Sequence, residues 1–270
     1  MERKMCAMTL MHKISASEIR RRTGVRDVIE TIYAPKMRWA GHVAGLNNDR
    51  WTSRALVTPH AEAGFCCPKS LTQTDQTRKI FLDFHNDVRR NIALGQPLLN
   101  FTSTGRRIIL GPAQNMYRVE WDCNLEQLAA QQIAPCKVPL PVNTSLATNI
   151  ARWLYFSTDE EAKVLKQIPY AWLISALQYM NGTNYYENKW AQSLVNIAYW
   201  KNQKIGCAYK VCPEQKNMVA SCVYGSGKIP LYTEVWEPGK TCTCNDRTGS
   251  FCCDNLCDTH AAAEARHQCC

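Results

Sequence analysis

This sequence contains no long apolar run. No stretch approaches the roughly 20 consecutive apolar residues that a helix needs to cross a bilayer, so no membrane span is predicted. The first residues, MERKMCAMTLMHKISASEIRRR, also lack the apolar core of about 7–15 residues that a secretory signal peptide carries, because charge interrupts them too soon. We therefore expect no signal peptide in this chain.

Histidine is scarce in the larger part of the chain. The sequence has six histidines, but His85 is the only one between residues 61 and 259. A site that needs two imidazoles, for catalysis or for a metal ion, therefore cannot form there. His85 can be a catalytic base or a ligand, or it can be a packed, hydrogen-bonded structural residue. We favour the structural interpretation, because neither a partner histidine nor an evident nucleophile accompanies it.

Cysteine, in contrast, is abundant and unevenly placed. Residues 1–60 contain only Cys6, and the other fourteen of the fifteen cysteines lie between Cys66 and Cys270. This density indicates disulfides in an oxidising compartment or, as the alternative for the tail, zinc ligation. Fourteen cysteines can pair completely, so we expect a disulfide framework from residue 66 onward. The candidates are Cys66, Cys67, Cys123, Cys136, Cys207, Cys212, Cys222, Cys242, Cys244, Cys252, Cys253 and Cys257.

Three glycosylation sequons lie in the cysteine-rich part, at Asn100, Asn143 and Asn181. A single sequon is a weak signal, since the pattern arises by chance. Three of them together with many cysteines agree with secretion. We therefore expect an extracellular, glycosylated protein, although the chain itself shows no export signal.

Residues 1–60 differ from the rest in charge and in kind. They hold 11 of the 32 Lys and Arg residues but only 5 of the 23 Asp and Glu residues, and they include the run Arg20 to Arg22. A short basic run is more often a solvated surface than a nucleic-acid contact. We therefore do not expect nucleic acid as a partner, and nucleic-acid binding through residues 1–60 stays an alternative.

The pattern from Lys36 to Val43, KMRWAGHV, followed by Arg50 and Trp51, carries a resemblance. Residues 17–57 resemble the segment that follows the polymerase domain in endonuclease–reverse transcriptases of non-LTR retrotransposons. The match includes no polymerase carboxylates, so it implies no polymerase activity. We interpret residues 1–60 as a retrotransposon-like fragment without a function of its own, with a genuine small helical extension as the alternative.

Apolar spacing in the remaining chain predicts helices first and strands late. Apolar residues recur at intervals of three or four from Phe81 to Ile92, which predicts a helix. Thr74 or Asp75 can cap this helix, and Gly95 can end it.

Further helices are predicted over residues 121–133, over residues 159–181 with an interruption near Pro169, and around a buried face formed by Trp190, Leu194 and Ile197. Alternation over residues 205–211 and 219–223 predicts a hairpin of two strands. Helices followed by antiparallel strands indicate an α+β fold.

Several motifs in this order resemble the CAP superfamily, also called SCP/TAPS, and in particular the venom-allergen-like, activation-associated secreted proteins of nematodes. They are TDQTRKIFLDFHNDVRRNIALGQ, PAQNMYRVEWDCNLEQLAAQQIAPC, IAYWKNQKIGCAYKVC with VASCVYGSG, and EPGKTCTCNDRTGSFCCDNLC. The resemblance covers residues 66–257 and leaves residues 258–270, with Cys269 and Cys270, as an uncertain tail. It implies a three-layer α-β-α sandwich of CAP/SCP type that is stabilised by disulfides and is extracellular.

The resemblance also implies a cavity in which two His and two Glu hold a divalent cation in many members. Here the corresponding positions carry Leu140, Thr148, Ser175 and Ser193. These residue types do not supply the imidazole and carboxylate ligands that suit zinc and similar ions. We therefore expect no metal, no other cofactor and no catalytic residue in this degenerate cavity.

The expected function is binding without catalysis. Family members are known for sterol or fatty-acid binding, so the resemblance implies either an extracellular protein partner or a small lipid- or sterol-like ligand. Tyr and Trp are concentrated over residues 170–200, where most of them are expected in the core and some can line a groove. A hydrolase built around the cavity is the alternative.

Overall fold

The structure is a computed structural model that describes residues 64–98, 108–136, 145–155, 161–180 and 182–259. These residues all belong to one unit of the chain, which begins at Ala63. The interpretations given above for residues 1–60, for the three sequon asparagines, for Leu140 and for residues 260–270 lie outside the described part. Among the described residues, no helix is both long enough and apolar enough to cross a membrane.

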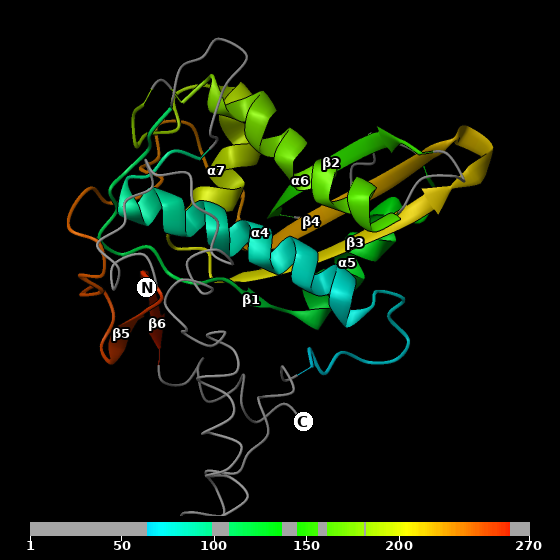
Figure 1. Ribbon diagram of the computed structural model, residues 1–270, viewed down its shortest axis with the longest axis horizontal. Helices are drawn as coiled ribbons and strands as arrows, with labels where there is room; N and C mark the ends of the chain where they lie inside the picture. Colours follow the sequence, from blue (N-terminus) through cyan, green and yellow to red (C-terminus); the bar gives the residue numbers. More distant parts are fainter. Residues whose placement is uncertain (1–63, 99–107, 137–144, 156–160, 181, 260–270) are drawn as a thin grey trace, which may run out of the picture. The chain divides into compact units, whose positions relative to one another are not determined.

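The described elements follow the α+β order, with most helices before the two long paired strands (Figure 1). In chain order they are α4 (Asp75–Leu94), β1 (Glu120–Trp121), α5 (Cys123–Ile133), β2 (Leu146–Leu154), α6 (Glu161–Leu177), η3 (Lys189–Ala191), α7 (Gln192–Ala198), β3 (Lys204–Cys212), η4 (Pro213–Gln215), β4 (Asn217–Gly227), β5 (Ser250–Cys253) and β6 (Leu256–Thr259), where η marks a short 3-10 helix.

Helix α4 begins and ends as the sequence predicts. The side chain of Thr74 caps it by accepting a hydrogen bond from the Thr77 amide at 3.2 Å. Gly95 ends it in the left-handed conformation with φ of 61°, which glycine adopts without a steric penalty. Phe81 and Ile92 are fully buried, so the predicted apolar stripe faces the core.

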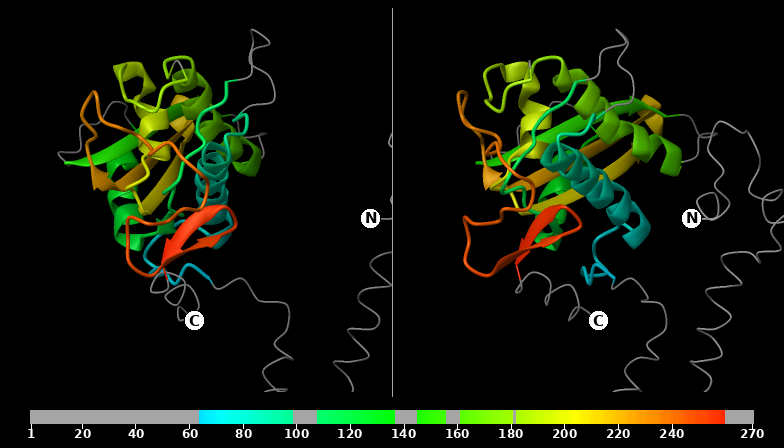
Figure 2. Two further views of the ribbon diagram at one scale, coloured as in Figure 1. Left: turned by 90° about the vertical axis from the view of Figure 1, so that its left-hand side faces the viewer. Right: turned by 60° about the vertical axis from the view of Figure 1, so that its left-hand side comes forward.

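Four described strands form a sheet in the order β1-β3-β4-β2, in which β3 and β4 make the predicted hairpin. Helix α5 covers one face of this sheet, and α4, α6 and α7 pack against the other. Figures 1 and 2 show α4 and α5 on opposite sides of the sheet. The expected three-layer α-β-α sandwich is confirmed.

Alternation along the strands explains the two cores. On β3, Cys207 faces the larger core beneath α4 and α7, whereas Ala208 faces the smaller core beneath α5. Successive side chains of a strand point to opposite faces, so one strand sequence can serve both layers. Gly206 lies where α5 passes closest, and a Cβ there would come within 2.0 Å of the Glu126 nitrogen.

Three details of the predicted elements are wrong. Trp121 lies in β1 rather than in a helix, because Asp122 caps α5 with its side chain and the helix begins at Cys123. Helix α6 continues through Pro169, where burial in the core outweighs the hydrogen bond that proline cannot donate. Trp190 is 64% exposed rather than buried, because it lies in η3 before α7 begins.

The described residues form five disulfides: Cys67–Cys123, Cys136–Cys212, Cys207–Cys222, Cys242–Cys252 and Cys244–Cys257. A disulfide-stabilised domain is therefore confirmed, and the tail cysteines in bridges do not ligate zinc. Cys66 belongs to none of these five bridges, and Cys253 is an exposed free thiol in the described part of the chain. The expectation that every cysteine from residue 66 onward is paired is therefore wrong at Cys253. Its strand, β5, pairs it with Leu256 rather than with a cysteine.

Candidate functional site

Three of the four degenerate cavity positions are described, on three different elements. Thr148 lies on β2, Ser175 on α6 and Ser193 on α7. The hydroxyls of Ser175 and Ser193 both donate to the carbonyl oxygen of Trp172, at 3.3 and 2.8 Å. The fold therefore brings these two positions together, but it uses their hydroxyls to bond the backbone of α6.

The buried side of this region is an amide network. Asn149 donates to the Ser193 carbonyl at 2.9 Å and to the Tyr224 hydroxyl at 2.8 Å. Asn196 donates to the Asn149 side-chain oxygen at 2.9 Å and to the Thr148 carbonyl at 3.2 Å. Polar groups buried in this way need such partners, and the network joins α7 to β2 and β4.

His85 is part of the same network and is fully buried. Its Nδ1 lies 2.7 Å from the Phe81 carbonyl oxygen, which can only accept, so Nδ1 carries the proton. Nε2 then accepts from the Tyr224 hydroxyl at 2.9 Å. Burial, opposed by the Phe81 bond and assisted by the charge of Arg89, lowers the pKa of His85 to about 4. This geometry agrees with the structural interpretation of His85.

Arg89 lies one turn further along α4 and is also fully buried. Its guanidinium donates to the carbonyl oxygens of Tyr117, Ile197, Tyr199, Trp200 and Asn202, at 2.7 to 3.3 Å. Burial lowers the pKa of Arg89 to about 9. The guanidinium fastens the end of α7 and the following turn to α4, which is a structural task.

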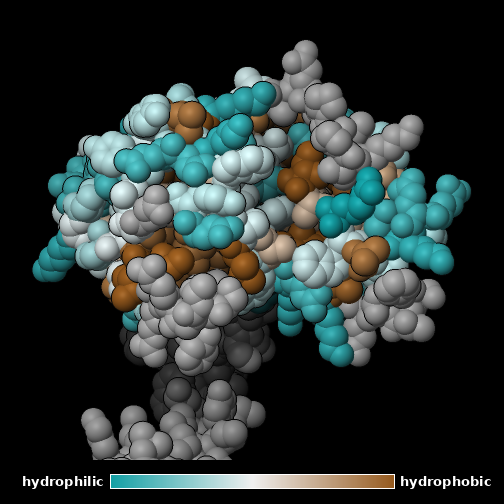
Figure 3. Space-filling view, turned by 90° about the horizontal axis from the view of Figure 1, so that it is seen from above, coloured by the Kyte–Doolittle hydropathy of each residue, from teal (hydrophilic) through white to brown (hydrophobic). Residues whose placement is uncertain are grey.

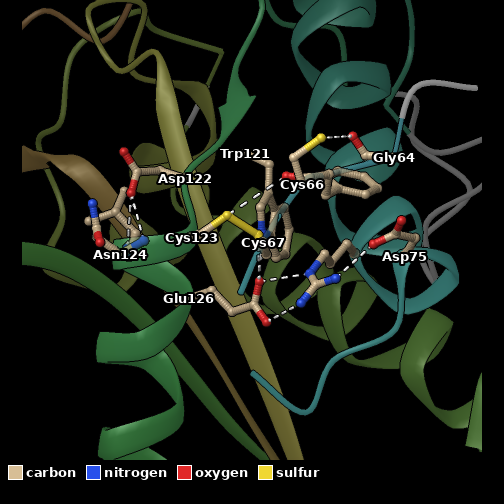
Figure 4. Close-up of a disulfide and its surroundings, with 12 residues drawn as sticks. Gly64, Cys66, Cys67, Asp75, Trp121, Asp122, Cys123, Asn124 and Glu126 are labelled. Carbon is tan, nitrogen blue, oxygen red and sulfur yellow. Dashed lines mark hydrogen bonds and ion pairs between the residues drawn. A yellow bond between two sulfur atoms is a disulfide. The ribbon is translucent and has the colours of Figure 1, made fainter. Parts of the chain in front are cut away.

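A second buried charge site lies beside the Cys67–Cys123 disulfide (Figure 4). The fully buried Glu126 of α5 accepts from Arg78 Nε at 2.8 Å and Nη2 at 2.9 Å, and from the Trp121 indole at 2.8 Å. Hydrogen bonding to Glu126 raises the pKa of Arg78. Sequence reasoning missed this pair, because nothing in the spacing of α4 and α5 shows that they meet.

Two grooves of the described surface flank α6. The α4–α6 groove has a volume of about 430 Å³ and carries charged residues of both signs, including Asp83, Asp87 and Lys166. The other, which we call the α6–β2 groove, has a volume of about 660 Å³. It is lined by Trp153 of β2 and by Lys166, Gln167, Tyr170, Ala171, Ile174 and Ser175 of α6.

The α6–β2 groove is mainly apolar although it opens to solvent. Tyr170 is 48% exposed and Ile174 is 57% exposed, and both lie on one stripe of α6 with Lys166, at a spacing of four residues. Figure 3 shows hydrophobic side chains reaching the surface in separate patches among hydrophilic ones. Of the three described cavity positions, Ser175 alone lines this groove. The sequence indicated that some of the Tyr and Trp residues over residues 170–200, which include Tyr170, can line a groove. Trp153 was missed, because β2 was not predicted.

No described group of three or more His, Cys, Asp and Glu side chains is arranged to hold a metal ion. The described cavity positions Thr148, Ser175 and Ser193 offer hydroxyls rather than imidazoles and carboxylates, and the two serine hydroxyls already bond the Trp172 carbonyl. These residues therefore do not fit the two-histidine, two-glutamate cation site. Among the described residues, neither Ser175 nor Ser193 has a histidine beside it, since the one histidine there, His85, uses both ring nitrogens inside the core.

Comparison with known proteins places these features in context. A model of the cysteine-rich secretory protein family, CAP, matches residues 82–224. The Ancylostoma secreted protein of Ancylostoma caninum is 31% identical over 203 residues, which cover 73% of this chain and 46% of that protein. The crystal structure of Na-ASP-1 matches with a TM-score of 0.60 and 32% identity over 71% of this chain and 47% of that one.

The crystal structure of NaASP2 with Zn²⁺ matches with a TM-score of 0.57 over 71% of this chain and all of that one, but at 22% identity it is similar in fold alone. This chain spans about half the length of the Ancylostoma secreted protein and of Na-ASP-1. The order of helices and strands, the disulfides and the family match agree with one another. The chain belongs to the cysteine-rich secretory protein family, the CAP family.

Proposed function

We propose that this chain is an extracellular, non-catalytic binding domain whose α6–β2 groove receives an apolar part of its ligand. The observation that carries the proposal is the exposure of Tyr170 and Ile174 beside Trp153 in a groove of about 660 Å³. Large apolar side chains that remain exposed together in a concave surface are typical of binding sites.

Two observations support binding without catalysis. His85, the one histidine between residues 61 and 259, is fully buried and cannot reach a substrate. Within the described part of the chain, the hydroxyls of Ser175 and Ser193 bond the Trp172 carbonyl, and no hydrogen bond joins either of them to a general base. Hydrolysis of peptide or ester substrates by the purified chain, lost in His85→Ala, would contradict this part of the proposal.

The extracellular setting is supported by the disulfides and by a relative. Bridges such as Cys67–Cys123 form and persist in oxidising compartments. The similar protein of Ancylostoma caninum is described as secreted. We extend that setting to this chain.

The test of the groove is an apolar fluorescent probe, anilinonaphthalene sulfonate. Ile174→Asp places a charge on the floor of the groove, so we expect the probe to bind at least about tenfold more weakly. Leu231→Asp is the matched control, because Leu231 is a comparably exposed apolar residue, 44% against 57%, that does not line the groove. Equal losses in both variants, or none in Ile174→Asp, would exclude the groove as the binding site.

A further inference from the structure

Strand β2 lies at the edge of the described sheet. In the order β1-β3-β4-β2 its one neighbour is β4. It spans Leu146–Leu154, so its free edge is long for a strand that carries no partner. Figure 1 shows β2 at the margin of the sheet, beside α6.

The register shows which backbone groups face outward. The Tyr155 amide donates to the Lys216 carbonyl at 3.1 Å, just beyond the paired end of the strand. In an antiparallel ladder, residues two apart share a direction, so Trp153 and Ala151 also bond toward β4. The residues between them, Arg152 and Leu154, therefore turn their N–H and C=O groups outward.

The outward groups differ along the strand. The carbonyl of Thr148 is taken by the Asn196 side chain, at 3.2 Å. Within the described part of the chain, the outward N–H and C=O groups of Ile150, Arg152 and Leu154 bond to no other residue. Among the described residues, α7 therefore occupies the free edge at the Thr148 carbonyl, whereas the edge from Ile150 to Leu154 is open.

The side chains along this open edge, from Ile150 to Leu154, have a pattern of their own. Arg152 is exposed and forms no ion pair with any described residue. Trp153 points to the opposite face of the sheet and lines the α6–β2 groove, where Lys166 is the only charged residue of the described lining. An unpaired cation and an apolar groove carrying one more cation thus lie on either face of the same open edge.

We propose that the open edge of β2 binds an extended acidic segment of a partner protein as an additional antiparallel strand. This proposal rests on the proposed function of the α6–β2 groove and names the class of its partner. The residue of the segment that pairs with Arg152 carries a carboxylate. Its neighbour points to the other face and places an apolar side chain in the groove beside Trp153. Backbone bonds give such an added strand its affinity, and alternate side chains give it specificity.

A second copy of this chain fits the edge less well. Two β2 strands paired antiparallel about Arg152 would bring two uncompensated arginines side by side, and like charges in a cross-strand pair are destabilising. The basic side chain therefore opposes self-pairing and favours an acidic segment.

The test uses the full chain and a fluorescein-labelled peptide, acetyl-TVEVT-amide, with acetyl-TVKVT-amide as its charge control. We expect TVEVT to bind at least about tenfold more tightly than TVKVT, and Arg152→Glu to reverse this preference. Hydrogen exchange of the Ile150, Arg152 and Leu154 amides should slow when TVEVT binds.

Two further measurements isolate the backbone pairing. Methylation of the glutamate amide of the peptide should abolish binding, since that N–H faces the Arg152 carbonyl, whereas methylation of a valine amide, which points away, should not. On the protein, Ile150→Pro removes one outward N–H without breaking a bond to β4, so it should weaken peptide binding and leave anilinonaphthalene sulfonate binding unchanged.

Peptide binding that survives methylation of the glutamate amide, or that does not respond to Arg152→Glu, would overturn the proposal. Self-association of the chain through this edge, seen by sedimentation and lost in Ile150→Pro, would overturn it in favour of a second copy. If the fluorescent probe binds in the groove but the peptide does not bind at all, the strand pairing is wrong and the proposed function of the groove stands.

Discussion

At the scale of single residues, this domain buries groups that proteins usually leave in water. His85, Arg89 and Glu126 are all fully buried, and each is satisfied by hydrogen bonds from several elements. Burying such a group lowers the stability of the fold unless each of its polar atoms has a hydrogen-bond partner. Their effect is to fix how α4, α5 and α7 meet the sheet, which makes His85 a determinant of stability rather than of chemistry.

His85 gives the stability of the domain a specific dependence on pH. Its pKa falls from 6.5 to about 4 on folding, so the neutral form stabilises the fold above pH 6.5. As the pH falls from 6.5 to 4, the unfolded chain takes up a proton that the folded chain refuses, and stability decreases by up to about 3 kcal/mol.

Urea unfolding between pH 4 and 7 measures this effect. In His85→Gln the part of the pH dependence that comes from the imidazole should disappear. The difference in the free energy of unfolding between the unsubstituted chain and His85→Gln should therefore shrink as the pH falls. A constant difference across this range would show that His85 does not titrate as its burial requires.

At the scale of elements, the close approach of neighbouring elements and the position of a strand in the sheet determine the arrangement of helices and strands more than intrinsic propensity does. Helix α5 crosses β3 at Gly206 with no room for a side chain, and α6 remains one helix through Pro169 because its buried face holds it. Strand β2 forms in the same way, by pairing with β4, although its sequence, LATNIARWL, shows no clean alternation of apolar and polar residues.

Gly206→Ala tests the close approach of α5. The added Cβ would lie 2.0 Å from the Glu126 nitrogen and 2.4 Å from the Leu125 carbonyl carbon, so the helix must shift. We expect the free energy of unfolding to fall by about 3 kcal/mol or more. Gly227→Ala is the control, because its nearest neighbour is 3.7 Å away, and it should change stability by less than about 0.5 kcal/mol. Equal stability of the two variants would contradict the packing described here.

The strengths and gaps of sequence-based prediction follow from the same physics. Helix α4 was predictable, since its apolar stripe, its cap at Thr74 and its stop at Gly95 are all local signals. Strand β2 was not predictable, because it is an edge strand that helices cover only in part. Its sequence therefore has no continuous alternation of apolar and polar residues. The groove that Trp153 forms with Tyr170 was hidden for the same reason, although the concentration of Tyr and Trp over residues 170–200 indicated that some of these side chains can line a groove.

At the scale of the whole molecule, disulfides tie the layers and the tail together. Cys67–Cys123 joins the segment before α4 to the first turn of α5, and Cys244–Cys257 holds the β5–β6 hairpin to the preceding loop. Family, layers and bridges could be inferred from the order of motifs. The pairing itself, and the exposed thiol of Cys253, depend on which segments meet in space.

Replacing both cysteines of one bridge, Cys67→Ser with Cys123→Ser, tests this role. A bridge between residues 56 apart in sequence restricts the unfolded chain, so its loss should lower the free energy of unfolding by about 2–5 kcal/mol. Cys253→Ser is the control and should change stability by less than about 0.5 kcal/mol, since that thiol is free and exposed. A comparable loss in the control, measured by urea unfolding, would mean that Cys253 is bridged.

Binding through the α6–β2 groove can be observed residue by residue. Isotope-labelled protein is titrated with anilinonaphthalene sulfonate and observed by two-dimensional NMR. We expect the shifted signals to cluster at Trp153, Tyr170 and Ile174, which line the groove. Shifts that cluster instead at other exposed apolar residues, such as Trp190 and Tyr232, with the groove unaffected, would contradict it.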